Sequence, residues 1–304
     1  MKKTIGAILS SLLAAALALS CGLGVSAREE TCLQAADHCR REESIPTLPQ
    51  RQETRSILLI GQDHAPEQPG ARSDSMILCT ICPGNKSMTM TSILRDLYVE
   101  IPGYGKNRIN AAYAFGGAEL LEKTLLQNLG IEVEGSVEVD FEHFSRLMDL
   151  LGGVPMELRQ DEAREINRVV PDSDLHAGSA ILSGDQALAY ARIRKLDPDS
   201  DVSRSKRQRK VLEQIYGQYQ AASARELVRV LREALPMINT NMKKSDIFKF
   251  AGVLLPIMND LKVESRRIPA PGTYRDLTVN HMAVLDADLR ANRDLVRELQ
   301  SPAG

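Results

Sequence analysis

Tryptophan is absent from this chain of 304 residues, and aromatic residues make up only 4% of it. This scarcity argues against an aromatic-lined sugar cleft or a base-stacking platform as the main binding device. An excess of one charge is also missing, since 38 basic and 40 acidic residues leave a formal net charge of −2. The balance argues against nucleic acid as a partner. The hydrophobic fraction of 43% excludes disorder and is enough for one large domain or two small ones.

The N-terminus carries an uncharged run, residues 4–27, directly after Lys2 and Lys3. Basic residues, a stretch rich in Leu and Ala, and small residues before Arg28 are typical of a cleavable signal peptide. The run is also long enough to cross a bilayer as one helix. Cys21 would suit a lipoprotein, but the residues before it match that signal poorly. Residues 1–27 are predicted to be a signal peptide or membrane anchor. The protein is then extracytoplasmic, either associated with the cytoplasmic membrane or secreted after cleavage.

Residues 28–54 are rich in charge, contain Pro46 and Pro49, and lack a sustained apolar period, which is typical of a linker. Further on, apolar runs of strand length occupy residues 56–61, 76–82, 87–93 and 263–269, and helical patterns occupy 118–129, 141–151, 161–169, 184–193, 205–220 and 287–299. Strands mixed with helices predict an α/β fold. We expect a single domain over residues 55–304.

Four cysteines follow the N-terminal run, and export would permit disulfides. Cys32 and Cys39 lie in the linker and are either paired or free. Cys79 and Cys82 fall in one strand-length run, where positions i and i+3 face opposite sides and are not easily bridged. We expect both to be small buried side chains. The five histidines have no spacing that would complete a zinc tetrad.

Charged residues lie where the first predicted strands begin or end: Asp63 after the first, Asp74 before the second and Arg95 after the third. Strand ends next to exposed loops are where α/β sheets place ligands. Two carboxylates such as Asp63 and Asp74 suit Mg²⁺ or Mn²⁺, which take a few carboxylates together with phosphate oxygens. An Asp after a strand is also a common turn former or helix cap, so spacing alone leaves both interpretations open.

Basic residues concentrate between positions 192 and 210. Arg192 and Arg194 are two apart, so on an extended segment both guanidiniums face the same way. Arg204 and Gln208 are four apart and share one helix face. Forked guanidiniums match phosphate oxygens, and a helix N-terminus near Ser205 would add partial positive charge for a pyrophosphate. The alternatives are a solvated basic face or a nucleic-acid patch, and export disfavours the second.

Several motifs, in this order, resemble the LytR-CpsA-Psr family of the bacterial cell envelope. They span about residues 57–212 and comprise 58–63, 72–76, 92–96, 108–113, 151–154 and 182–188, followed by the arginine cluster. The chain departs from the family pattern at Arg108, where Lys is usual, and at Leu94, where Pro is usual. Arg108 keeps the charge but not the geometry. Beyond residue 212 the resemblance is thin, and Lys206, Arg207, Arg209 and Lys210 are compatible with solvent-facing charges.

The resemblance implies an αβα sandwich with a central mixed sheet, an apolar pocket for a polyprenyl chain and a charged mouth for its pyrophosphate. The implied activity is Mg²⁺-dependent phosphotransfer, with Mn²⁺ as an alternative ion. A glycopolymer, such as a teichoic acid or capsular polysaccharide, moves from an undecaprenyl-pyrophosphate carrier to peptidoglycan. The implied residues are Asp63 and Asp74 for the metal, Asp63, Asp74 and Arg95 for catalysis, and Arg95, Arg108, Arg192, Arg194, Arg204 and Gln208 for the pyrophosphate.

Two other functions share part of this pattern. A polyprenyl-pyrophosphate hydrolase would use the same donor site with water as the attacking group. A non-catalytic, envelope-linked binder or regulator would leave Asp63 and Asp74 without a metal-dependent role. Apolar residues 141–151 suit either a lipid tunnel or a helix core, and core packing is favoured for each one singly. The segment 103–110 either contacts the acceptor glycan or turns the chain, and we favour the turn.

Overall fold

The computed structural model describes residues 54–62, 73–220, 222, 229–230 and 232–300. Within this part of the chain, a six-stranded mixed sheet has the order β10-β3-β2-β1-β6-β9. Its strands are β1 (Arg55–Gln62), β2 (Ser73–Cys82), β3 (Ser87–Ile93), β6 (Ser136–Asp140), β9 (Asn239–Thr240) and β10 (Lys262–Ile268). Strands β1 and β6 are parallel, as are β3 and β10, and the other neighbouring strands are antiparallel.

The central strands are apolar because both of their faces are covered. Alternate residues of β1 enter different cores: Ile57 packs on one side of the sheet and Leu58 on the other. Strand β2 divides in the same way, with Ile77 in the first core and Leu78 in the second. The strands therefore form the middle layer between two separate hydrophobic cores.

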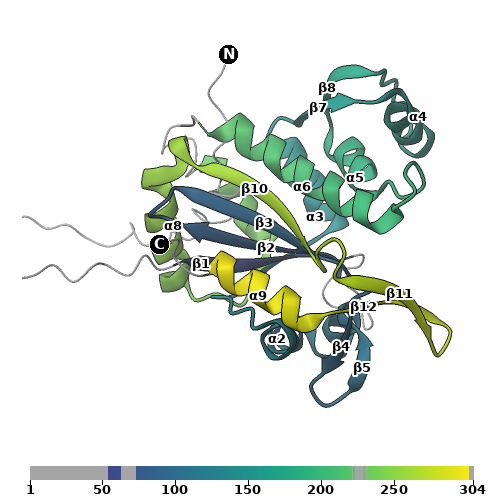
Figure 1. The fold of residues 1–304 in the computed structure, drawn as a ribbon. Coiled ribbons are helices and arrows are strands. Elements are labelled where there is room, and N and C mark those ends of the chain that lie inside the picture. Colours follow the sequence, from purple (N-terminus) through teal and green to yellow (C-terminus); the bar gives the residue numbers. More distant parts are fainter. Residues whose placement is uncertain (1–53, 63–72, 221, 223–228, 231, 301–304) are drawn as a thin grey trace, which may run out of the picture.

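Helices cover both faces of the sheet (Figure 1). One face carries α3 (Phe141–Leu150), α5 (Gly184–Arg192) and α6 (Ser200–Tyr219), and the other carries α2 (Ile109–Leu129) and α9 (Leu289–Gln300). Further helices are α4 (Gln160–Val169) and α8 (Lys244–Leu254), and 3-10 turns lie at Leu235–Met237 and Leu255–Asp260. The predicted α/β class, with an αβα sandwich around a mixed sheet, is confirmed.

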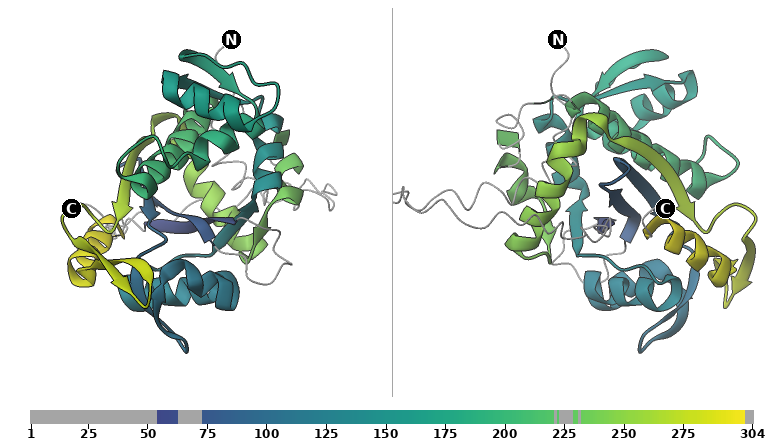
Figure 2. Two further views of the ribbon diagram at one scale, coloured as in Figure 1. Left: turned by 90° about the vertical axis from the view of Figure 1, so that its right-hand side faces the viewer. Right: turned by 60° about the vertical axis from the view of Figure 1, so that its left-hand side comes forward.

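Three hairpins project from this sandwich (Figure 2). They are β4 (Tyr98–Ile101) with β5 (Gly105–Arg108), β7 (Val154–Leu158) with β8 (Gly178–Leu182), and β11 (Tyr274–Val279) with β12 (Met282–Ala287). These hairpins are not predicted from the sequence, because their strands are short and several are half-polar. The predicted strands and helices elsewhere are confirmed.

Cys79 and Cys82 are free and buried, as predicted. The predicted signal or anchor, the linker as far as residue 53, Cys32 and Cys39 lie outside the described residues. Among the helices that are described, none combines the length and the apolar character needed to cross a membrane.

One edge of the sheet collects the ends of several strands. Strands β1 and β6 end there side by side, with Gln62 opposite Asp140, and the antiparallel β2 begins there. The loop after β3 is fixed at the same edge by distant parts of the chain. Leu94 N donates to Ile268 O at 2.8 Å, and Leu285 N donates to Asp96 O at 2.8 Å. This edge therefore gathers Asp74 and Arg95, which are far apart in the sequence.

Helix α5 closes over this edge through a tight contact with α3. Its N-terminus is a capping box in which the Ser183 side chain accepts from Gln186 N, so the helix begins at Gly184. A Cβ atom at position 184 would lie only 1.9 Å from Ser145 O. Glycine at this position allows α5 and α3 to approach, and the C-terminus of α5 then reaches the sheet edge at Arg192.

Candidate functional site

A polar cavity lies at the sheet edge, between the start of β2 and the α5–α6 connection. It is lined by Gly61, Asp74, Ser75, Phe141, Arg192, Arg194, Arg204 and Gln208. Arg204 and Gln208 face it from one side of α6, as their spacing predicts. Ser75 Oγ donates to Gln208 Oε1 at 3.1 Å. The cavity thus brings together four members of the predicted pyrophosphate-binding set and Asp74.

Asp74 is the acidic centre of the cavity, and three guanidinium groups surround its carboxylate. Arg95 Nη1 donates to Asp74 Oδ1 at 2.9 Å. Arg194 Nη2 lies 3.6 Å and Arg204 Nη1 lies 4.0 Å from Asp74 Oδ2. The Arg192 guanidinium stands over the Phe141 ring, 4.4 Å from its centroid, and within the described part of the chain it forms no ion pair with a carboxylate.

Two further carboxylates, Asp96 and Asp201, form ion pairs with these arginines but do not line the cavity. Arg204 Nη2 lies 3.2 Å from Asp201 Oδ1, and Arg108 Nη1 lies 3.2 Å from Asp96 Oδ1. Arg95 Nε lies 3.5 Å from Asp201 and 3.6 Å from Asp96. Neither carboxylate is among the site residues predicted from the sequence. The spacing of Asp201 three residues before Arg204 on one helix face was the signal that could have identified it.

The protonation states follow from this crowding. Burial lowers the pKa of Arg95, but Asp201, Asp96 and Asp74 together outweigh burial and leave its pKa raised. Burial and a hydrogen bond to Asp201 raise the pKa of Asp96 to about 6. Arg95 is therefore a permanent cation, whereas Asp96 keeps its proton in mildly acidic solution.

The site is positive within the described part of the chain. Five guanidiniums, those of Arg95, Arg108, Arg192, Arg194 and Arg204, accompany the three carboxylates of Asp74, Asp96 and Asp201. The buried Nε atoms of Arg95, Arg108 and Arg204 make no hydrogen bond to any described residue. An anion with several oxygens would be attracted by this excess of positive charge.

An apolar pocket continues directly from the cavity into the first hydrophobic core. Its walls come from β1, β2, β6 and helices α3, α5 and α6, and include Leu59, Ile77, Val137, Phe144, Leu147, Met148, Leu188 and Val211. The two spaces share five lining residues: Gly61, Ser75, Phe141, Arg192 and Gln208. Leu147 and Met148 are buried in the first core, as predicted, and together with Phe144 they also line this pocket. The combined site has an apolar interior and an arginine-rich mouth.

The other predicted site residues occupy different positions. Asp63 lies outside the described residues, so its place as a metal ligand stays a prediction. Arg108 meets the cluster only through Asp96 and is not among the cavity-lining residues. Arg192 is the last residue of α5 and is not extended as predicted, yet it still faces the cavity with Arg194. Helix α6 begins at Ser200, so Ser205 lies in its second turn and not at its N-terminus.

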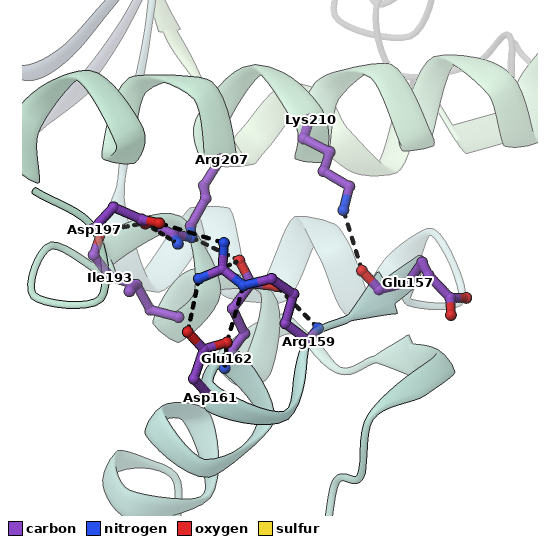
Figure 3. A network of polar contacts seen from close by, with 8 residues as sticks. All are labelled: Glu157, Arg159, Asp161, Glu162, Ile193, Asp197, Arg207 and Lys210. Atoms are coloured by element: carbon purple, nitrogen blue, oxygen red, sulfur yellow. Dashed lines mark hydrogen bonds and ion pairs between the residues drawn. The ribbon is translucent and has the colours of Figure 1, made fainter. Parts of the chain in front are cut away.

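The basic run 206–210 also differs from expectation, because two of its members are buried. Arg207 donates to Glu162 Oε1 at 3.0 Å and to Asp197 Oδ2 at 2.5 Å (Figure 3). Arg209 donates to Ser92 Oγ at 2.5 Å. Of the four basic residues expected to face solvent, only Lys206 is exposed. These arginines attach α6 to its neighbours and hold the face that carries Arg204 and Gln208 against the cavity.

The raised pKa of Asp96 predicts how stability depends on pH. The folded protein keeps this proton up to about pH 6, whereas the unfolded chain releases it near 3.8. The stabilisation is therefore complete below the lower value and is lost as pH rises through the higher one, by about 1–3 kcal/mol. Urea unfolding of the wild type and of Asp96→Asn across this range measures the effect. The substitution is expected to flatten the profile, and equal slopes in both proteins would contradict the assignment.

The sequence and the fold together define a family. The sequence profile of the LytR_cpsA_psr family matches residues 24–298. The chain belongs to this family, and the resemblance found in its motifs is confirmed.

Named relatives give this assignment more detail. The Regulatory protein MsrR of Staphylococcus aureus (strain COL) is 36% identical over 250 residues, which are 80% of this chain and 73% of MsrR. The polyisoprenyl-teichoic acid--peptidoglycan teichoic acid transferase TagU of Bacillus mycoides (strain KBAB4) is 40% identical over 161 residues. That match spans 53% of this chain and 51% of TagU.

Solved structures agree with the sequence relatives. The structure described as TagT bound to LIIa-WTA has a TM-score of 0.68 at 31% identity, with 82% of this chain and 90% of that one covered. YwtF (TagT) with bound octaprenyl pyrophosphate lipid has a TM-score of 0.62 at 27% identity, with 84% and 94% covered.

Proposed function

We propose that this protein transfers a glycopolymer from a polyprenyl-pyrophosphate carrier to peptidoglycan. The observation that carries the proposal is the continuity of the apolar pocket with the arginine-lined cavity through five shared residues. A polyprenyl pyrophosphate has the same two parts, a long apolar chain and a head with a high negative charge. The names of TagU and of the lipid-bound YwtF (TagT) support the same donor and acceptor.

The arginines would stabilise the negative charge that develops on the leaving phosphate during transfer. A hydroxyl oxygen of the acceptor sugar forms a bond to the phosphorus that carries the glycan, with release of the hydroxyl proton. The bond from that phosphorus to the bridging oxygen breaks, and polyprenyl phosphate leaves. Negative charge grows on the bridging oxygen, and Arg194 and Arg204 are held by Asp74 and Asp201 where they can stabilise it.

Asp74 suits a magnesium ion that is shared with the substrate. Its Oδ1 accepts from Arg95, whereas its nearest cations at Oδ2, among the described residues, are Arg194 at 3.6 Å and Arg204 at 4.0 Å, and Asp74 lines the cavity. Mg²⁺ is usually held by one or two carboxylates together with substrate phosphates. Asp74 would hold it, with Asp63 as the second carboxylate. When bound, the ion would neutralise phosphate charge, and Mn²⁺ would fit the same oxygen donors.

We further propose an extracytoplasmic location next to the cytoplasmic membrane, because the donor is a membrane lipid. Residues 1–27 would provide a signal peptide or an anchor there. The protein belongs to a family of the cell envelope, which is consistent with this location.

A reconstituted reaction tests the function. Full-length protein in detergent is mixed with a polyprenyl-pyrophosphate-linked glycan, peptidoglycan oligomers and Mg²⁺, and products are identified by mass spectrometry. We expect a glycan-phosphate-peptidoglycan adduct that disappears on chelation and returns with added Mg²⁺. Asp74→Asn should lower its formation at least about a hundredfold.

The exposed Asp260 provides a matched control, since it pairs only with Lys86 on the surface and Asp260→Asn should leave the rate unchanged. Release of free phosphoglycan without adduct would identify a hydrolase. Donor that stays intact under all conditions would identify a binding protein or regulator.

A further inference from the structure

Two exposed aromatic rings are stacked on each other on the face of the sheet opposite the lipid pocket. Tyr104 lies at the tip of the β4–β5 hairpin and is 55% exposed, and Phe115 on α2 is 43% exposed. Their centroids are 4.6 Å apart and their planes differ by 16°. Large aromatic side chains are normally buried, and this chain has only 5 Phe and 7 Tyr. Such an exposed pair indicates a binding surface.

The backbone presents both rings through conformations that favour glycine. Tyr104 stands between Gly103 (φ +81°) and Gly105 (φ +72°). Phe115 is followed by a break in α2, where Gly117 has φ +63° and ψ −158°. A Cβ atom at any of these three glycines would meet nothing within 4 Å, so the requirement is conformational and not spatial. Specialised backbone of this kind is concentrated at functional sites.

The hairpin connects the ring pair with the charged cluster. Tyr104 is at its tip, and Arg108, the last residue of β5, pairs with Asp96 at 3.2 Å. Arg108 is four positions beyond Tyr104, which corresponds to about 13 Å along an extended strand. This span is the length of a few sugar rings. In Figure 1 the hairpin lies beside α2, on the other side of the sheet from α3, α5 and α6, which enclose the lipid pocket.

We propose that Tyr104 and Phe115 form an acceptor surface on which the peptidoglycan glycan strand stacks. The proposal rests on the proposed transfer function and deepens it. Sugar rings have an apolar face of C–H groups that packs on an aromatic ring, while their hydroxyls stay in water. A strand that crosses the pair and reaches Arg108 would bring one of its hydroxyl groups to the cluster. The surroundings are mixed in charge, with exposed Lys106 and Glu119, which suits a glycan better than an anionic bilayer surface.

Binding of defined glycan strands to the full-length protein tests this surface. Strands are released from peptidoglycan by removal of the stem peptides and are titrated against each variant. Tyr104→Ala and Phe115→Ala should each weaken binding roughly tenfold. Tyr104→Leu keeps an apolar side chain without the ring and should lose as much affinity as Tyr104→Ala. Tyr104→Phe should bind like the wild type. The exposed residues Leu126 and Ile181 give the control variants Leu126→Ala and Ile181→Ala, which should not change the affinity.

Several readouts separate this surface from the donor site and from folding. In the transfer reaction the ring variants should raise the KM for the acceptor, with kcat, the affinity for polyprenyl pyrophosphate and the thermal unfolding midpoint unchanged. Wild-type affinity in both Ala variants, or a loss of binding to phosphatidylglycerol vesicles in place of the strands, would overturn the proposal. A wild type that binds strands through these rings but forms no adduct would overturn the transfer function alone.

Discussion

Replacing Arg204 by methionine is expected to slow glycopolymer transfer by at least about a hundredfold. The side chain is only 4% exposed and holds its guanidinium between Asp201 at 3.2 Å and Asp74 at 4.0 Å. Methionine fills a similar volume but offers neither charge nor donors to the phosphate that leaves. Water cannot easily take the place of a buried cation, so the transition state loses a preorganised partner. Single-turnover rates with saturating donor measure the loss directly.

A second buried arginine of the same helix serves as the matched control. Arg209 is buried to the same degree, but it donates to Ser92 and is not among the cavity-lining residues. Arg209→Met should therefore retain most of the transfer rate. Equal losses in both variants would mean that burial of charge on α6 supports the fold and that Arg204 has no special role in the reaction.

Replacing Arg207 by methionine is expected to cause the largest loss of stability, about 3–5 kcal/mol in the free energy of unfolding. Arg207 and Glu162 are each 5% exposed, and Arg207 also bonds Asp197. Removing the cation takes the 3.0 Å partner from the buried Glu162 carboxylate, which keeps the Arg159 backbone N–H at 3.1 Å and the Arg159 guanidinium at 4.0 Å. Urea unfolding followed by circular dichroism measures the change, with the slope of the transition as a check that the unfolded state is unaltered.

The companion variants determine whether the uncompensated charge is the cause. The double variant Arg207→Met, Glu162→Leu removes both charges and should recover most of the lost stability. The exposed pair of Lys123 and Glu119 lies on α2, and Lys123→Met should have no measurable effect. A double variant as unstable as Arg207→Met would show that the packing of the arginine stem matters more than charge.

The elements of the sandwich were predictable because their patterns are local. Apolar runs identified β1, β2 and β3, and the helix face shared by Arg204 and Gln208 followed from their spacing alone. The family motifs then connected these elements to one site. Asp74, Arg192 and Arg194 were also predictable from local pattern, because each lies at or next to a strand or helix that the sequence indicates.

What the sequence did not reveal depends on contacts between distant segments. The buried state of Arg207 depends on Glu162, which is 45 residues away. Asp96 and Asp201 join the cluster only because the β3 loop and α6 meet at the sheet edge. The lining of the lipid pocket by Phe144 depends on space that other side chains leave open. None of these contacts produces a periodic pattern in the sequence.

The fixation of the loop after β3 has a consequence for how the protein matures. Arg95 sits between Leu94 and Asp96, whose backbones are bonded to Ile268 and Leu285. The strand that ends at Ile268 also forms the edge partner of β3. The Arg95 loop therefore cannot reach its final position until nearly all of the chain has been made and folded. A chain that lacked residues 262–285 would therefore lose both backbone bonds that fix the Arg95 loop, and with them the arginine geometry of the site.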